Sequence, residues 1–166
     1  MVTSVTASRT PYFTDWHIGR LVSNEMKTLH ENQIVNSLAW VVMPDHFHWL
    51  FELRSDELGN CLQYVKMRSA TAINHRLNRD GRIWQPGYFE RAMRRHSDIK
   101  QAARYIIANP LRQGLVQQIG DYPLWDAIWL PDYHRDSASF NRRCGIGAVR
   151  QPILTSSIII DSRLNR

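Results

Sequence analysis

Two apolar runs in the first third of the chain are separated by only two residues, and these two residues are typical of a turn. Residues 37–43 read SLAWVVM and residues 46–53 read HFHWLFEL, and only Pro44 and Asp45 lie between them. Apolar and aromatic runs of this length predict β-strands, and a Pro-Asp pair between two such runs predicts a reversal of the chain. The chain is therefore expected to contain an antiparallel hairpin.

Alternating and helical patterns flank this hairpin. Residues 1–6 (MVTSVT) alternate in the manner of a strand, and apolar residues recur at helical spacing between residues 15 and 32. Helical spacing returns over residues 58–77, and residues 88–94 (YFERAMR) alternate again. Two further strands and two helices are therefore expected around the hairpin.

A third helical segment follows the last predicted strand. Ser97 or Asp98 is its expected N-cap, and Pro110 is expected to limit it, because the residue before a proline is disfavoured in the helical region. The resulting order is strand, helix, strand, strand, helix, strand and an extra helix. This order predicts an α+β fold of the ferredoxin-like, split-βαβ type, with a central antiparallel sheet and helices on one face.

The charge of the chain is concentrated in its centre. The chain has 166 residues, which is the length of one folded domain, and it carries a formal net charge of +6. Residues 64–105 hold ten Lys or Arg and three Asp or Glu, whereas residues 1–63 hold four and seven. Such a positive block attracts polyanions, nucleic acids above all. We expect one domain over residues 1–130 and a polar, flexible tail over residues 131–166.

Several classes of protein are disfavoured by the sequence. Cys61 and Cys144 form no CxxC pair, and two cysteines cannot build a disulfide framework. No apolar stretch approaches the ~20 residues that span a bilayer, and the first residues lack the pattern of a secretory signal. We therefore expect a cytoplasmic, nucleoid-associated protein with no membrane contact.

Two histidines in the second strand of the hairpin are spaced to share a ligand. Side chains at i and i+2 of a strand point to one face, ~7 Å apart along it, so His46 and His48 can converge on one divalent metal. Phe47 between them is then expected to point into the helix-covered core. The same pattern is also consistent with two solvent-facing histidines that hold no ligand.

Tyr105 and Asn109 are neighbours on the predicted third helix, because residues i and i+4 lie on one side. A tyrosine hydroxyl is a competent nucleophile for phosphoryl transfer, and an amide oxygen is a hard ligand for Mg²⁺ or Mn²⁺. The alternative is structural, with Tyr105 at the edge of the core and Asn109 as a helix C-cap. Together with the histidines, these residues are the parts of a metal-assisted attack on a phosphodiester.

The segments MPDHFHWLF and ARYIIANPLRQGLV resemble those of the REP-associated tyrosine transposases, a branch of the single-tyrosine HUH nucleases related to insertion-sequence transposases. The family pattern is MP-x-H-x-H on a strand and Y-I-x-x-N-P-h-[RK]-x-G on a helix, and WQPGYFERAMR between them is similar too. The resemblance covers roughly residues 1–130 and implies the same ferredoxin-like fold. It implies Tyr105 as the nucleophile, with His46, His48 and Asn109 as ligands of Mg²⁺ or Mn²⁺.

The resemblance further implies a metal-dependent endonuclease and strand transferase that acts on single-stranded DNA. It would cleave and rejoin DNA at palindromic hairpins through a 5′-phosphotyrosine intermediate, as a monomer or homodimer. Phe89 lies among the basic residues and could stack on an unpaired base, but we expect it in the core. The central block supplies the candidate DNA contacts, which are Lys66, Arg68, Trp84, Tyr88, Arg91, Arg94, Arg95, Lys100 and Arg104.

Two other functions stay open on the residues alone. A non-catalytic single-stranded nucleic-acid binding module would use exposed aromatics on adjacent central strands, for which Trp40, Trp49 and Phe51 are candidates. A zinc hydrolase would use the histidine pair with Cys61, although the chain lacks an HExxH motif.

Overall fold

The computed structural model describes residues 1–93 and 95–128. The elements in chain order are β1 (Val2–Val5), α1 (Trp16–Glu31), β2 (Val35–Met43), β3 (His46–Leu53), α2 (Leu58–Arg76), β4 (Phe89–Glu90), α3 (His96–Arg112) and β5 (Trp125–Ala127). Short 3-10 turns lie at Ala7–Arg9, Tyr12–Thr14 and Ile119–Asp121. The tail predicted over residues 131–166 lies outside the described residues.

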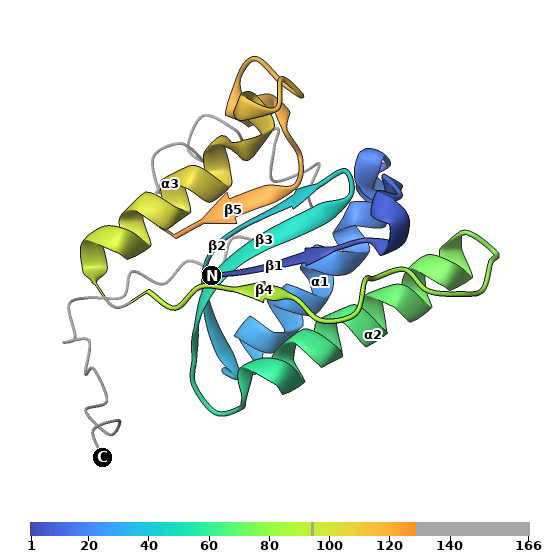
Figure 1. Ribbon diagram of the computed structural model, residues 1–166, viewed down its shortest axis with the longest axis horizontal. Coiled ribbons are helices and arrows are strands. Elements are labelled where there is room, and N and C mark those ends of the chain that lie inside the picture. The colour runs from blue at the N-terminus through green and yellow to red at the C-terminus, as the bar shows by residue number, and fades with distance from the viewer. Residues whose placement is uncertain (94, 129–166) are drawn as a thin grey trace.

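The strands form one antiparallel sheet in the order β4-β1-β3-β2-β5. Helices α1 and α2 cover one face of the sheet, and α3 packs over β2, β3 and β5 on the other face (Figure 1). The first four strands and two helices have the ferredoxin-like arrangement, so the predicted fold is confirmed. Strand β5 was not predicted, because three residues are too short to show a period.

The central hairpin is held firmly at its turn. Strands β2 and β3 pair from Met43 opposite His46 onward, as predicted. Thr6 donates to the Asp45 carbonyl from both its backbone N–H (2.8 Å) and its hydroxyl (3.0 Å), and Phe13 N–H donates to the Pro44 carbonyl (3.0 Å). These bonds fix the residue that immediately precedes the histidine pair.

The helices form where the spacing of apolar residues predicts them, because each helix has an N-cap or an apolar face that is buried on folding. The Asp15 carboxylate accepts a hydrogen bond from His17 N–H (2.9 Å) and starts α1, which buries Ile18, Val22 and Met26 against the sheet. Phe47 is fully buried on the same side, as predicted. Within the described residues, no helix has the length and apolar character needed to cross a membrane.

Three local expectations are wrong. The strand expected over residues 88–94 is only the two-residue β4, which pairs with β1 at the edge of the sheet. Helix α3 begins earlier than expected, with Arg95 and not Ser97 or Asp98 as its N-cap, and it does not stop before Pro110 but continues to Arg112. Proline there removes one backbone donor from the last turn without breaking the helix axis, and its consequence appears in the site described next.

Candidate active site

A cavity of about 350 Å³ opens between α3 and the strands beside it. The central sheet contributes its floor, and the last two turns of α3 contribute one wall. The lining residues are Thr3, Arg9, His46, His48, Phe89, Tyr105, Asn109 and Gln113. The four residues predicted to carry the chemistry therefore line one cavity, although they come from two elements more than fifty residues apart.

The two histidines of β3 lie side by side at the floor of this cavity. Their ring centroids are 4.8 Å apart, with the rings at 78° to one another. Only 8% of His46 and 9% of His48 is exposed, because α3 covers this part of the sheet. The face that carries the pair is therefore not an open surface, contrary to the solvent-facing alternative.

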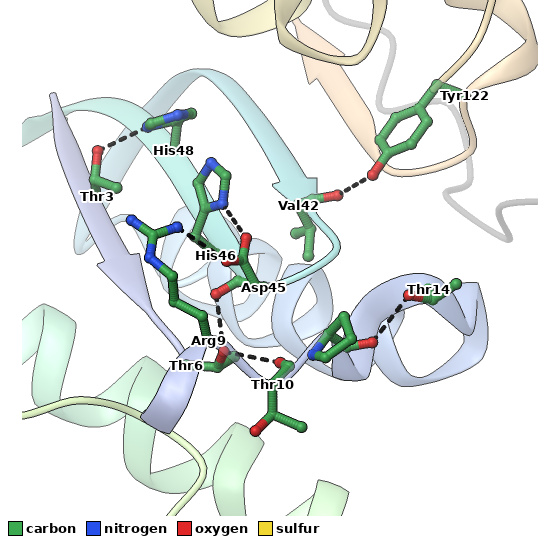
Figure 2. Close-up of polar contacts among 11 residues, drawn as sticks. Thr3, Thr6, Arg9, Thr10, Thr14, Val42, Asp45, His46, His48 and Tyr122 are labelled. Carbon is green, nitrogen blue, oxygen red and sulfur yellow. Dashed lines mark hydrogen bonds and ion pairs between the residues drawn. The ribbon is translucent and has the colours of Figure 1, made fainter. Parts of the chain in front are cut away.

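Each imidazole is oriented by a bond to its Nδ1 atom (Figure 2). His46 Nδ1 lies 2.6 Å from Asp45 Oδ1, and His48 Nδ1 lies 2.7 Å from Thr3 Oγ1 of β1. When Nδ1 carries the proton and donates to these oxygens, each Nε2 retains a lone pair. A carboxylate or hydroxyl behind a histidine is the usual arrangement around a metal-binding imidazole.

The charge states of the surrounding groups suit cation binding. Burial and the neighbouring His46 lower the pKa of His48 to about 4, so His48 is neutral at pH 7. Burial raises the pKa of the Asp45 carboxyl, but its bonds to His46 and to Arg9 outweigh burial and lower its pKa below the ordinary value. Asp45 is therefore an anion that holds both His46 and the Arg9 guanidinium, at 3.0 Å (Figure 2).

The buried neutral His48 predicts a pH-dependent stability of the metal-free protein. Its pKa is about 4 in the folded state and about 6.5 when unfolded, so the unfolded chain binds the proton first as the pH falls. This stabilisation is complete above pH 6.5 and is lost toward pH 4, by on the order of 2 kcal/mol between pH 7 and pH 5. Urea unfolding in EDTA measures it.

His48→Asn is the matched variant, because an amide keeps a polar contact to Thr3 but does not titrate in this range. We expect a shallower dependence of the free energy of unfolding on pH in this variant. If the free energy of unfolding depended equally on pH in the two proteins, the buried His48 would not be the cause of the loss of stability at acidic pH.

Tyr105 stands at the rim of the cavity. Its side chain is 42% exposed, its ring centroid lies 6.0 Å from that of His48, and the Arg112 guanidinium lies 5.3 Å from the centre of its ring. Its hydroxyl makes no hydrogen bond to the described residues. A cation over the ring restrains it without engaging the hydroxyl, which leaves the oxygen free to react.

Asn109 is buried (4% exposed) one turn along α3 from Tyr105. Its Nδ2 donates to the Tyr105 carbonyl (2.8 Å) and lies 3.4 Å from the Ile106 carbonyl, which lacks its helical donor because Pro110 has no N–H. The amide oxygen accepts no hydrogen bond within the described chain, and Asn109 lines the cavity. The C-cap alternative is wrong, since Gln113 is the C-cap.

Two imidazole nitrogens and one amide oxygen thus border one space. This donor set suits a divalent cation of mixed nitrogen and oxygen preference. No three His, Cys, Asp or Glu side chains of residues 1–93 and 95–128 group to hold a metal. Cys61 is buried in α2, on the opposite face of the sheet, so a zinc site with the histidine pair and Cys61 is contradicted.

The predicted DNA contacts divide between two sides of the molecule. Trp84 is buried (5% exposed), and its ring packs against Phe13 and Phe47, so its predicted base-stacking role is contradicted. Lys66 donates to the carbonyls of Gln85 (2.7 Å) and Gly87 (2.6 Å), which anchors the loop before β4. Arg68 and Tyr88 also lie along α2 and that loop, away from the cavity.

The remaining basic candidates lie between β4 and the middle of α3. All four are exposed, and none makes a salt bridge with the described residues. These residues are Arg91, Arg95, Lys100 and Arg104. Arg94 lies outside the described residues. These residues lie on the helix that carries Tyr105 or in the segment just before it, where phosphate contacts near the cavity would be needed.

Five residues near the site were missed or misjudged from the sequence. Phe89 was expected in the core and is 71% exposed at the edge of the cavity. Arg9 and Thr3 come from the first ten residues, which carry no recognisable motif. Asp45 directly precedes the histidine pair, and Arg112 lies about one helical turn after Asn109. Their positions relative to the motifs could have identified both as residues of the site.

Comparison with known proteins identifies relatives of this chain. The family model described as "Transposase IS200 like" matches residues 2–109. The REP-associated tyrosine transposase of Escherichia coli (strain K12) is 31% identical over 102 residues, which make up 60% of this chain and 55% of that protein. The putative REP-associated tyrosine transposase of Haemophilus influenzae is 26% identical over 136 residues, 75% and 73% of the two chains.

The fold is also found among solved structures. One of them is that of a REP-associated tyrosine transposase bound to a REP hairpin, with a TM-score of 0.63 and 22% identity over 95% of this chain and 90% of that chain. The matched architecture extends over the sheet and its three helices. The described chain thus shares its fold with a DNA-bound transposase.

Proposed function

Because this chain belongs to the IS200-like transposase family, we propose that it is a REP-associated tyrosine transposase acting on single-stranded DNA. In this proposal it cleaves and rejoins DNA at palindromic hairpins through a 5′-phosphotyrosine intermediate. The observation that carries the proposal is the meeting of Tyr105 and the histidine pair in one cavity, with the Tyr105 and His48 rings 6.0 Å apart.

The proposed reaction exchanges one ester bond for another. Tyr105 Oη attacks the scissile phosphorus, an Oη–P bond forms and the P–O3′ bond breaks. The phenol loses its proton and the leaving 3′ oxygen gains one, so the products are a 5′-phosphotyrosine and a free 3′-hydroxyl. A second 3′-hydroxyl can attack the phosphotyrosine and rejoin strands without nucleotide hydrolysis, and the chain has no GxxxxGK[ST] motif.

His46, His48 and Asn109 are the residues that would hold a divalent metal, Mg²⁺ or Mn²⁺. When bound, such an ion would polarise a phosphate oxygen and stabilise the negative charge on the phosphoryl oxygens in the transition state. The Nδ1 bonds to Asp45 and Thr3 keep both imidazoles in a metal-binding orientation, and the bonds of Asn109 Nδ2 to its own helix leave the amide oxygen available as a ligand. The protein thus holds three donors in place before any ligand arrives.

Two arginines are placed to assist. Arg9 lines the cavity, and only one of its nitrogens is bound to Asp45, which leaves N–H groups for a phosphate oxygen. Its side chain is 68% exposed, so DNA can reach it. Arg112 lies over the Tyr105 ring and restrains it.

The binding-module alternative is supported less well. It needs exposed aromatics on the central strands, but Trp40 is 8% exposed and Trp49 is fully buried. It also leaves two oriented histidines without a purpose. A covalent adduct distinguishes the two functions, because a binding module forms none.

The test is incubation of the protein with single-stranded REP hairpins carrying unpaired flanks and with Mn²⁺, followed by denaturing gel electrophoresis. We expect a protein–DNA adduct that survives denaturation, together with a free 3′ product. EDTA should prevent both. A protein that binds these hairpins and yields no adduct with Mn²⁺ or Mg²⁺ would be a binding module.

DNA affinity should fall steeply with salt, because phosphate neutralisation releases counterions. Replacement of Arg95, Lys100 and Arg104 by Gln should weaken binding to all hairpins and lower the salt slope by about 1 for each lost phosphate contact. Fluorescence anisotropy over a range of salt concentrations measures both quantities. Arg54→Gln, at the far end of β3 from His46, is the control and should change neither. An unchanged slope in the triple variant would place the DNA path elsewhere.

A further inference from the structure

The exposed aromatic ring at the edge of the cavity has no role in the reaction described above. We propose that Phe89 is the stacking platform for an unpaired base that flanks the scissile phosphate. This inference rests on the proposed function and names a binding subsite within it. Its ligand is a nucleobase of single-stranded DNA.

The sheet register places Phe89 in line with the histidine pair. Thr3 of β1 pairs with Phe89 of β4 on one side and with His48 of β3 on the other. Paired residues on neighbouring strands share a face, and strands lie ~4.8 Å apart, so Phe89 lies roughly 10 Å from His48 on the same face. That distance suits a nucleotide next to the one whose phosphate is cut.

Helix α3 leaves this end of the face uncovered. It packs over β2, β3 and β5, and β1 and β4 lie beyond it at the edge of the sheet (Figure 1). Phe89 is 71% exposed, the largest exposed fraction among the large hydrophobic residues of the described chain. Its ring therefore presents a free aromatic surface beside the cavity.

The exposure of Phe89 does not come from a loose segment. Backbone bonds join Arg91 and Met1 in both directions at 2.9 Å on one side of β4. On the other side, Gln85 N–H donates to the Val5 carbonyl (2.9 Å), and Lys66 binds the carbonyls of Gln85 and Gly87. The ring is held outward by a backbone fixed at both ends.

The surroundings of this ring favour a nucleobase over an apolar partner. Arg9 lines the same cavity and Arg91 follows β4, so cationic groups for phosphates flank an aromatic surface. Alternation of basic groups and aromatic rings is the usual chemistry of single-strand binding, because every base offers a π-face. A base inside a duplex is covered on both faces by its neighbours, whereas an unpaired base in a flank offers its π-face to the ring.

The experiment measures binding of a REP hairpin with an unpaired flank of mixed sequence, placed on the 5′ or the 3′ side, in a Tyr105→Phe background that does not cut. 2-Aminopurine replaces each flanking base in turn. We expect Phe89→Leu, which keeps the bulk but removes the π-face, to weaken binding of the flanked hairpin roughly 5- to 150-fold. Phe89→Trp should retain the affinity, and fluorescence quenching at one flanking position should be lost only in Phe89→Leu.

Two controls isolate the effect. Met67→Ala removes another exposed hydrophobic side chain (57% exposed) on α2 and should not change binding. A hairpin without a flank should bind Phe89→Leu and its parent equally. If Phe89→Leu binds the flanked hairpin as tightly as its parent and keeps the quenching, the stacking subsite is refuted.

The proposed function is tested separately, by adduct formation in the wild-type protein. An adduct without any effect of Phe89 overturns the stacking subsite and leaves the proposed function standing. A protein that forms no adduct and does not distinguish a flanked from a flankless hairpin overturns the proposed function, and the subsite with it.

Discussion

Tyr105→Phe should abolish the protein–DNA adduct and lower the cleavage rate by roughly 10³-fold or more, because it removes the nucleophilic oxygen. Hairpin affinity and Mn²⁺ binding should stay within about twofold of wild type, since the aromatic ring stays in place. The hydroxyl makes no hydrogen bond to the described residues, so stability should change by less than about 0.5 kcal/mol. Denaturing gels, anisotropy and urea unfolding provide the three measurements.

The other tyrosines supply matched controls. Tyr122 is buried, and its hydroxyl donates to the Val42 carbonyl (2.7 Å; Figure 2), so Tyr122→Phe should cost about 1 kcal/mol of stability but keep the adduct. Tyr88 lines a groove along α2 and not the cavity of the histidines, so Tyr88→Phe should also keep the adduct. An adduct that persists in Tyr105→Phe would assign the nucleophile to another residue.

His46→Ala and His48→Ala should each lower metal-dependent cleavage by about 10³-fold, because each removes one of two imidazole donors. Both variants should still unfold cooperatively, since the hydrophobic core lies on separate residues of the sheet and helices. Mn²⁺ affinity, measured by calorimetry, should fall in parallel with the cleavage rate. A variant that cut hairpin DNA at the wild-type rate would refute the metal assignment.

The residues behind the histidines should have smaller effects. Asp45→Asn keeps the size of the side chain but removes the charge that orients His46, and such losses typically cost 10- to 100-fold in metal affinity or activity. Cys61→Ala is the control, because Cys61 lies on the opposite face of the sheet. It should leave metal binding unchanged.

The order of elements and the faces of the hairpin were predictable because they depend on local patterns. Alternation at i and i+2 put His46 and His48 on one face and Phe47 on the other, and the structure has them so. Local patterns do not say which face a later helix covers. The burial of the histidines under α3, and the exposure of Phe89 beyond its edge, depend on tertiary packing and could not be predicted.

Charge and composition misled at other positions for a similar reason. Trp84 and Lys66 belong to the basic central block, yet one is a core side chain and the other anchors a loop through two carbonyls. Thr3 is 45 residues from His48 in the chain, and only the pairing of β1 with β3 brings them together. A sequence pattern does not contain that register.

Mass spectrometry of the trapped adduct after tryptic digestion identifies the nucleophile directly. Trypsin cuts after Arg104 and Arg112 and releases YIIANPLR, which contains one tyrosine and no Ser, Thr or His. If the new bond hinders cleavage after Arg104, the longer peptide QAARYIIANPLR still has Tyr105 as its only hydroxyl-bearing side chain. We expect the nucleotide mass on this peptide, whereas a nucleotide on any other peptide would show that Tyr105 is not the nucleophile.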